Sequence, residues 1–129
     1  MKKIAVSMRN RVFSESIMFM LERTGSFRPI RITATPADKV LLECQAAKAE
    51  ILLLDVTPTS DETTLSGRMQ MIEKLREKQP KCKIVIFCDE VAHPEQAHEV
   101  MRAKQADLID DFFYASVTAE YLIAALEAI

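Results

Sequence analysis

The sequence is poor in glycine and cysteine, and each shortage excludes a class of site. Its two glycines, Gly25 and Gly67, cannot build the glycine-rich loops that bind the phosphates of nucleotides and dinucleotides. The three cysteines, Cys44, Cys82 and Cys88, contain no CxxC pair and are odd in number. A disulfide framework or a zinc knuckle is therefore not expected, and we predict reduced, buried thiols.

The chain also lacks an excess of basic charge and a long hydrophobic segment. A net charge of -2 argues against nucleic acid as a partner, because phosphate binding needs a concentrated basic surface. The longest apolar runs, such as residues 51–54, are too short to cross a membrane. No apolar segment typical of a signal peptide follows the start Met1-Lys2-Lys3, so we expect a cytoplasmic protein.

What is present is a regular alternation of short apolar runs with longer amphipathic segments. The apolar runs are residues 4–6, 30–32, 51–54, 84–87 and 112–114. Those centred on Leu53 and Val85 are continuously apolar, as in strands that helices cover on both faces. Five strands alternating with five helices predict one α/β domain over residues 1–129, with a doubly wound parallel sheet.

The helices carry recognisable apolar faces and start signals. Phe13, Ile17 and Leu21 share one face of the first helix, and Leu122 and Leu126 share one face of the last. Hydroxyl or proline residues mark three helix starts. These are Thr35-Pro36, where Thr35 would cap and Pro36 would be the first helical residue, then His93-Pro94, and Thr118.

The usual strand order for such a sheet is 2-1-3-4-5, the flavodoxin-like arrangement, with a switch point between the first and third strands. Ligands and chemistry gather there, outside the carboxyl ends of the strands. This order places Asp55, which follows the third apolar run, beside residues 7–10, which follow the first. Asp55 is then either a carboxylate that caps a loop or a nucleophile or cation ligand.

The order of elements, Asp55 after residues 51–54, and the closing segments Asp111-Phe112-Phe113-Tyr114 and Thr118-Ala119-Glu120-Tyr121-Leu122 resemble a response-regulator receiver domain. The resemblance covers essentially the whole chain. In that family the matching aspartate accepts a phosphoryl group from a histidine kinase or a small phosphodonor. The resemblance therefore implies a receiver-like fold and a signalling role.

Most of the other residues that serve this chemistry in the family are replaced. Met8 and Arg9 stand where the family has two acids that hold Mg²⁺, and a thioether and a guanidinium cannot supply its oxygen ligands. Cys88 replaces a hydroxyl residue, and Ala115 replaces a lysine. Phe112 keeps the aromatic ring of the fifth strand. These replacements indicate a degenerate receiver, or pseudo-receiver.

Two alternatives concern the charge around Asp55. Arg9 either pairs with Asp55, as a fixed cation where the metal would be, or is a solvated loop residue. Asp61, Asp89 and Glu90 are either solvated loop acids or rebuild a Mg²⁺ site with Asp55. Under the second alternative the chain is an active receiver that is phosphorylated on Asp55.

Our leading hypothesis is a signalling module that acts through protein contacts, without enzymatic activity and without a cofactor. The resemblance implies an output surface made of the fourth helix (residues 94–105), the fifth strand and the fifth helix, including Val117 and Tyr121. The expected partners are another protein, a second copy of the chain, or a histidine kinase. A small-molecule site at the Asp55 edge is a third hypothesis. The chain is either a complete protein or one domain of a larger one.

Overall fold

The computed structural model describes residues 1–58 and 62–129, and in these ranges five strands alternate with five helices. The strands are β1 (Lys2–Ser7), β2 (Phe27–Arg31), β3 (Ile51–Asp55), β4 (Lys83–Cys88) and β5 (Asp111–Tyr114). The helices are α1 (Arg11–Thr24), α2 (Ala37–Ala47), α3 (Leu65–Lys78), α4 (Pro94–Gln105) and α5 (Ala119–Ala128). The predicted alternation of five β–α units is confirmed.

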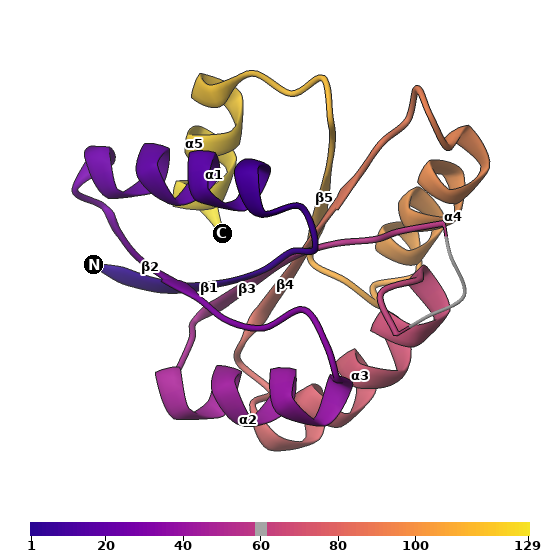
Figure 1. Ribbon diagram of the computed structural model, residues 1–129, viewed down its shortest axis with the longest axis horizontal. Coiled ribbons are helices and arrows are strands. Elements are labelled where there is room, and N and C mark those ends of the chain that lie inside the picture. The colour runs from indigo at the N-terminus through magenta and orange to yellow at the C-terminus, as the bar shows by residue number, and fades with distance from the viewer. Residues whose placement is uncertain (59–61) are drawn as a thin grey trace.

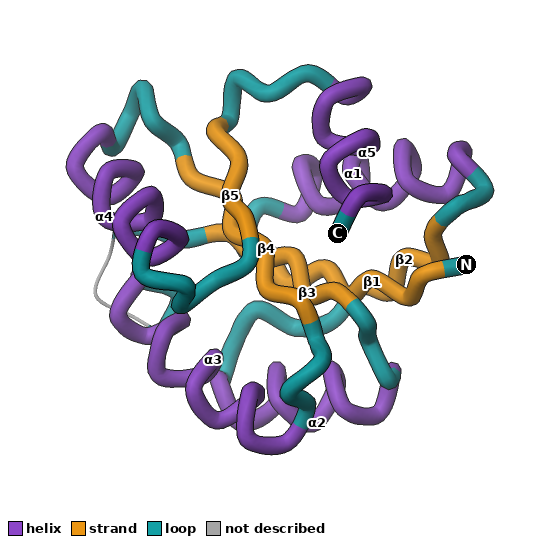
Figure 2. The backbone as a smooth tube through the Cα atoms, turned by 180° about the vertical axis from the view of Figure 1, so that it is seen from behind, coloured by secondary structure: helices purple, strands orange, loops and turns teal. Residues whose placement is uncertain are grey.

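The strands form one parallel sheet in the order β2-β1-β3-β4-β5, which confirms the predicted topology. Helices α1 and α5 lie on one side of the sheet, and α2, α3 and α4 lie on the other (Figure 1). The view from behind shows the same three layers (Figure 2). Helices α1 to α4 are the crossovers that return the chain to the start of the next parallel strand, and α5 follows the last strand.

The sheet separates two apolar cores, and β3 contributes to both. Leu52 and Leu54 pack towards α2, α3 and α4, whereas Ile51 and Leu53 pack towards α1 and α5. All four side chains are at most 1% exposed. This alternation follows from the two-residue period of a strand and explains why the run is continuously apolar.

Strand β2 differs from its prediction. It begins at Phe27 and ends at Arg31, whereas the apolar run predicted residues 30–32. Pro29 lies inside the strand, which is tolerated because β2 is at the edge of the sheet and needs hydrogen bonds on one side only. An edge strand buries less side-chain surface, so its apolar pattern is too weak to fix its start.

The helix starts are confirmed except at α2. Thr118 Oγ1 accepts a hydrogen bond from the Tyr121 N–H, and Pro94 is the first residue of α4. The prediction for Thr35-Pro36 was wrong, because Pro36 is itself the N-cap and α2 begins at Ala37. The N–H of Ala37, which has no acceptor within the helix, donates to the carboxylate of Glu62 in the loop before α3. A partner of this kind cannot be found from local sequence.

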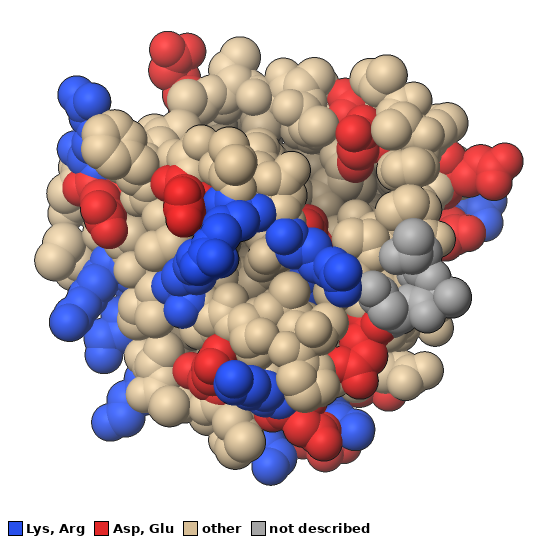
Figure 3. Space-filling view, in the orientation of Figure 1, with Lys and Arg blue, Asp and Glu red and all other residues tan. Residues whose placement is uncertain are grey.

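The surface carries mixed charge. Lysine and arginine side chains alternate with aspartate and glutamate on the face seen in Figure 3, without a continuous basic stripe on that face. None of the helices in the described ranges has the length and apolar character needed to span a bilayer.

Gly67, the third residue of α3, lies against the backbone of Glu62. A Cβ atom at this position would be 2.5 Å from the Glu62 carbonyl oxygen and 2.8 Å from its Cα. Both contacts are with main-chain atoms, which cannot rotate away. The loop between β3 and α3 therefore returns across the first turn of the helix, and glycine is required by this close approach.

We expect Gly67→Ala to destabilise the domain by about 1–3 kcal/mol, although alanine normally stabilises a helix relative to glycine. The added methyl group would push residue 62 and its contact with α2 away. Urea unfolding followed by circular dichroism measures the change. The neighbouring exposed Ser66→Ala is the matched control and should change stability by less than about 0.5 kcal/mol. Equal stability of Gly67→Ala and wild type would contradict the close approach.

Candidate functional site

Asp55 is the last residue of β3 and lies at the predicted switch point of the sheet. Ser7, the last residue of β1, pairs with Leu54 beside it. The backbone N–H of Arg9 donates to Asp55 Oδ2 over 3.1 Å. The predicted proximity of Asp55 to residues 7–10 is thus confirmed.

The cation that pairs with Asp55 comes from α3. Nη2 of Arg68 lies 3.1 Å from Asp55 Oδ1, and Nε of Arg68 donates to the Asp55 carbonyl oxygen over 3.0 Å. The Arg68 side chain is 2% exposed and that of Asp55 is 15% exposed. This is a buried ion pair at the carboxyl edge of the sheet.

The Arg68 guanidinium reaches three segments of the chain. Nη2 also donates to the Ser7 carbonyl oxygen over 2.9 Å, and Nη1 donates to Ser7 Oγ over 3.0 Å and to the Ala34 carbonyl oxygen over 3.4 Å. With the two contacts to Asp55, five acceptors face the five N–H groups of the guanidinium. Arg68 therefore joins the ends of β1 and β3 and the segment after β2.

The energetic consequence depends on both partners being present. Desolvating a guanidinium and a carboxylate is costly, and their attraction and hydrogen bonds offset this cost only when the geometry is complete. Removing one partner leaves the other charge buried without compensation. Both oxygens of Asp55 accept hydrogen bonds, one from the Arg68 guanidinium and one from the Arg9 N–H. This arrangement holds the carboxylate in place and engages both of its oxygens.

Of the two alternatives for Arg9, the one in which its guanidinium pairs with Asp55 is therefore wrong. Arg9 contacts Asp55 through its backbone, and Arg68 supplies the guanidinium. A signal for Arg68 is present in the sequence. Arg68 falls on one helical face with Met71, Ile72 and Leu75, all of them buried. A charged residue therefore occupies a position of the apolar stripe. An arginine at such a position needs a buried partner.

A cavity of about 220 Å³ adjoins Asp55. Asn10, Asp89 and Cys88 contribute the polar part of its lining, and Phe13 and Phe87 are among its apolar residues. Asn10 also caps α1, since its Oδ1 accepts a hydrogen bond from the Phe13 N–H over 3.0 Å. Asp55 thus keeps one small opening towards solvent despite its ion pair.

Two of the predicted site positions are part of the interior. Met8 is 5% exposed and packs in the core beneath α1 and α5. Cys88 is 4% exposed, and its thiol donates to the Phe113 carbonyl oxygen at 3.6 Å. Burial, together with the nearby Glu90 and Asp89 carboxylates, raises the pKa of Cys88 to about 11. The thiol is therefore protonated at neutral pH and is a weak hydrogen-bond donor at this edge.

The backbone N–H of Ala115 is hydrogen-bonded to the carboxylate of Glu90. This N–H donates to Glu90 Oε1 over 3.0 Å and to the Cys88 carbonyl oxygen over 2.9 Å. The Ser116 hydroxyl donates to Glu90 Oε2. These contacts join the loop after β4 to the loop after β5, at the place where the receiver resemblance implies a lysine. A carboxylate bound to the backbone stands there instead of an ammonium group.

Two of the acids proposed for a cation site, Asp89 and Glu90, have structural partners. Asp89 Oδ1 accepts the N–H groups of Val91 and Ala92, and Glu90 binds the loop after β5. Asp61 lies outside the described residues. Within residues 1–58 and 62–129, no cluster of three or more histidine, cysteine, aspartate or glutamate side chains is placed to hold a metal ion.

Phe112 lies in β5, the last strand of the sheet. Its ring contacts that of Tyr114, with centroids 5.4 Å apart, and the Lys104 ammonium lies 5.9 Å from its centroid. Phe112 is half-buried against the core beneath α2, α3 and α4. It is thus packed between that core and the surface formed by α4 and β5.

No protein-family profile matches this chain, and no curated protein matches it in sequence. Solved structures do match. The response regulator TrrA from Thermotoga maritima, solved with Mg²⁺ and BeF, has a TM-score of 0.72 and 16% identity, with 99% of this chain and 98% of that chain covered.

Two further structures agree. A two-component response regulator from Clostridium difficile has a TM-score of 0.74 and 16% identity, covering 99% of this chain and 94% of that chain. The receiver domain of NtrX from Brucella abortus has a TM-score of 0.71 and 18% identity, covering 97% and 95%. At these identities the likeness establishes the fold. The chain has the fold of response-regulator receiver domains over its whole length.

Because the Arg68–Asp55 pair is buried, we expect a large loss of stability when either partner is removed. Arg68→Met and Asp55→Asn should each lower the free energy of unfolding by about 3 kcal/mol, because each leaves one buried group without its partner. The double variant should lose clearly less than the sum of the two. Chemical denaturation of the four proteins measures this coupling.

Arg76→Met is the matched control on the same helix. Arg76 pairs with Asp110 at 3.3 Å, but its side chain is 33% exposed. We expect this variant to lose no more than about 1 kcal/mol. Additive effects of Arg68→Met and Asp55→Asn, or losses no larger than that of Arg76→Met, would show that the buried pair does not stabilise the edge.

Glu90 gives a prediction for titration. The hydrogen bond from the Ser116 hydroxyl, together with the Ala115 N–H, lowers the pKa of Glu90 below its ordinary value. The stability from these bonds is therefore present at neutral pH and is lost as the pH falls through the folded-state pKa. Ser116→Ala should raise the pKa of Glu90, measured by NMR of the side-chain carboxyl carbon. An unchanged pKa of Glu90 in Ser116→Ala would show that the Ser116 hydroxyl does not stabilise the Glu90 carboxylate.

Proposed function

We propose that this chain is a receiver-like signalling module that acts through protein contacts, and that Asp55 serves it as a structural carboxylate. The observation that carries the proposal is the buried Arg68–Asp55 pair, in which five acceptors face the five N–H groups of Arg68. A guanidinium that is committed in this way acts as a permanent counter-charge. It takes over the neutralising role that a bound cation has at an acidic site.

The chemistry of the edge supports a role without Mg²⁺. This ion needs an octahedral shell of oxygen ligands close to the phosphoacceptor. At the two positions where the receiver resemblance implies acidic ligands, the chain has the buried thioether of Met8 and has Arg9, whose backbone N–H donates to Asp55. Phosphoryl oxygens would also need cationic or hydroxyl donors. The protonated Cys88 thiol and the Glu90 carboxylate are unsuited to that task.

The proposed output surface lies around β5, the strand at the other edge of the sheet. Tyr121 is 64% exposed and Tyr114 is 38% exposed, and with Val117 they line a shallow depression of about 250 Å³. Exposed tyrosines beside a half-buried ring combine apolar contact area with hydrogen-bonding groups, a composition that is enriched in protein interfaces. This supports a protein partner that binds across α4, β5 and α5.

One observation favours the alternative function, a receiver that still accepts a phosphoryl group. Asp55 borders the 220 Å³ cavity, and Asp89 and Asn10 border it too. A cation could approach Oδ2 of Asp55 from this opening, with Asp89 as a second oxygen ligand. The alternative requires Asp55 to exchange its contact with Arg68 or Arg9 for the phosphoryl group and its metal.

The experiment that separates the two functions is incubation of the full chain with acetyl phosphate and Mg²⁺, followed by intact-mass measurement. We expect no phosphoryl adduct in the wild-type protein, because the carboxylate is engaged and the donors for the phosphoryl group are missing. A known active receiver, treated in parallel, verifies the phosphodonor.

Asp55→Ala is the control for the site of any adduct. An adduct in wild type that disappears in Asp55→Ala would contradict the structural role and establish the alternative. An adduct that persists in Asp55→Ala lies on another residue and leaves the assignment of Asp55 unchanged.

A further inference from the structure

A cavity of about 520 Å³ lies at the amino edge of the sheet, opposite to the edge that holds the buried ion pair. Three strands begin beside it, because Lys2 is the first residue of β1, Ile51 the first of β3 and Lys83 the first of β4. Ala49, which follows α2, and Gln79, which follows α3, complete its wall. The cavity is therefore separate from the ion pair and from the proposed output surface.

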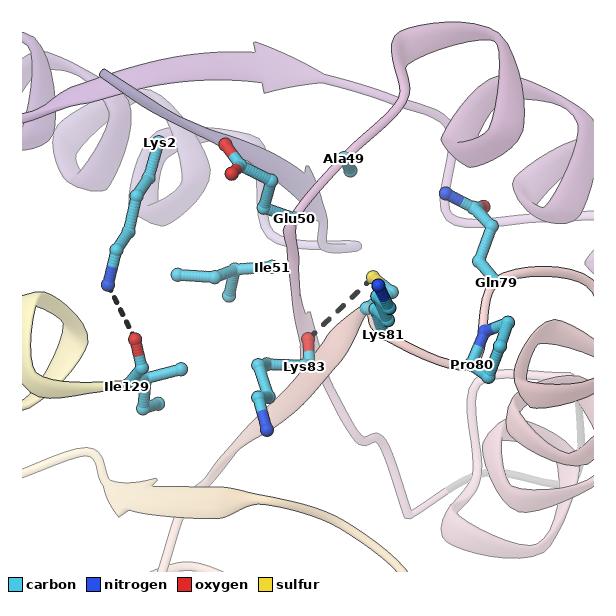
Figure 4. A pocket seen from close by; sticks show the side chains of 10 residues that line it. Lys2, Ala49, Glu50, Ile51, Gln79, Pro80, Lys81, Lys83 and Ile129 are labelled. Carbon is cyan, nitrogen blue, oxygen red and sulfur yellow. Dashed lines mark hydrogen bonds between the residues drawn. The ribbon is translucent and has the colours of Figure 1, made fainter.

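The lining of this cavity is mainly apolar. Lys2 and Ile129 form one side of it, and Gln79 and Pro80 form the other (Figure 4). Ile51 lies between the two sides. The volume is in the range of sites that bind small organic molecules, and such sites combine an apolar wall with a few polar groups. An apolar part of a ligand would be removed from water here.

The charges around the apolar lining are mainly positive. The lining includes three lysines, Lys2, Lys81 and Lys83. A glutamate, Glu50, lines the cavity too, and its carboxylate accepts the Lys3 N–H over 2.8 Å. Since the whole chain has a net charge of -2, the excess of positive charge is local to this edge. The ligand charge that complements it is negative.

Two of the lysines can turn towards a ligand. Lys81 is exposed. Lys83 is half-exposed, and its Nζ approaches Asp110 Oδ1 only to 3.9 Å. Oδ2 of the same carboxylate is bound more closely, by Arg76 at 3.3 Å and by the Ile84 N–H at 2.7 Å. Lys81 and Lys83 can therefore meet an anion without breaking a buried contact.

Gln79 gives an independent indication that this cavity holds a molecule. Its Oε1 atom is buried and accepts no hydrogen bond from residues 1–58 or 62–129. Buried acceptors are nearly always paired, and water or a ligand provides the donor where the protein does not. The terminal torsion of a glutamine is soft, so the amide can turn towards a polar group in the cavity.

We propose that this cavity binds a small organic carboxylate with an apolar body, such as an aromatic acid. The apolar body would cover Ile51 and Pro80, and the carboxylate would lie near the ammonium groups of Lys81 and Lys83. Apolar contact supplies most of the affinity, and the lysines select an anion over a neutral or cationic molecule. The proposal is independent of the signalling role argued above and of the chemistry of Asp55.

The test titrates the folded, ¹⁵N-labelled full chain with 1-naphthoate and follows the backbone amides by two-dimensional NMR. We expect saturable shifts centred on residues 49–51 and 79–83, and a higher melting temperature in the presence of the ligand. The neutral 1-naphthamide and the cationic 1-naphthylmethylammonium carry the same rings and should bind at least about threefold more weakly. High salt should weaken the binding of naphthoate and leave that of naphthamide unchanged.

The double variant Lys81→Gln/Lys83→Gln removes both charges without changing the core. It should bind naphthoate at least about threefold more weakly than wild type. Lys39→Gln/Lys74→Gln is the matched control, because it changes the net charge equally at two exposed lysines that do not line the cavity. This control should bind as wild type.

Three results would each overturn the proposal. The first is the absence of saturable shifts at residues 49–51 and 79–83 up to about 10 mM naphthoate. The second is equal binding of the three naphthalene ligands, and the third is unchanged naphthoate binding in Lys81→Gln/Lys83→Gln.

Discussion

The carboxyl edge of this domain depends on one buried cation. Arg68 extends from α3 beneath the loops and donates to the ends of β1 and β3 and to the segment that follows β2. Without it these strand ends would leave buried carbonyl groups unpaired and one mostly buried carboxylate without its counter-charge. The guanidinium matches this need because it carries five donors in a fixed plane. The loop that lets α3 approach so closely requires glycine at position 67.

The acidic side chains near this edge in the described part of the chain, Glu62, Asp89 and Glu90, also have structural partners. Glu62 binds the first N–H of α2, Asp89 binds the turn before α4, and Glu90 joins the loops after β4 and β5. In an acidic phosphorylation site the carboxylates converge on a cation. Here they spread outwards to backbone N–H groups, and the charge of Asp55 is balanced from inside the protein. This distribution of charge is the physical basis for the structural role that we propose for Asp55.

The fold could be predicted from the sequence because its information is local and repeated. The continuous apolar runs of β3 and β4 and the helical faces of α1 and α5 indicate a doubly wound parallel sheet. The crossover rules limit its possible strand orders, and the observed order is the usual one for five strands. The position of Asp55 at the switch point followed from that order. The start of β2 was missed because an edge strand carries a weaker apolar pattern.

The partner of Asp55 could not be predicted in the same way. One of the two alternatives for Arg9 paired it with Asp55 because it follows β1 and is near in the topology, but the ion pair depends on which side chain faces inwards. Arg68 is 13 residues from Asp55, after a loop whose path the sequence does not specify. Its place on the stripe of Met71, Ile72 and Leu75 was the available signal, since a charged residue on a buried helical face requires a partner.

The most direct test of this account observes the Arg68 guanidinium itself by ¹⁵N NMR at neutral pH. A guanidinium whose N–H groups all donate inside the protein exchanges its protons slowly with water, and its Nε–H signal should persist long after those of exposed arginines such as Arg11 have exchanged. Asp55→Asn should shift this signal and accelerate its exchange. An Arg68 Nε–H that exchanges as fast as that of Arg11 in the wild-type protein would contradict the buried pair on which the account depends.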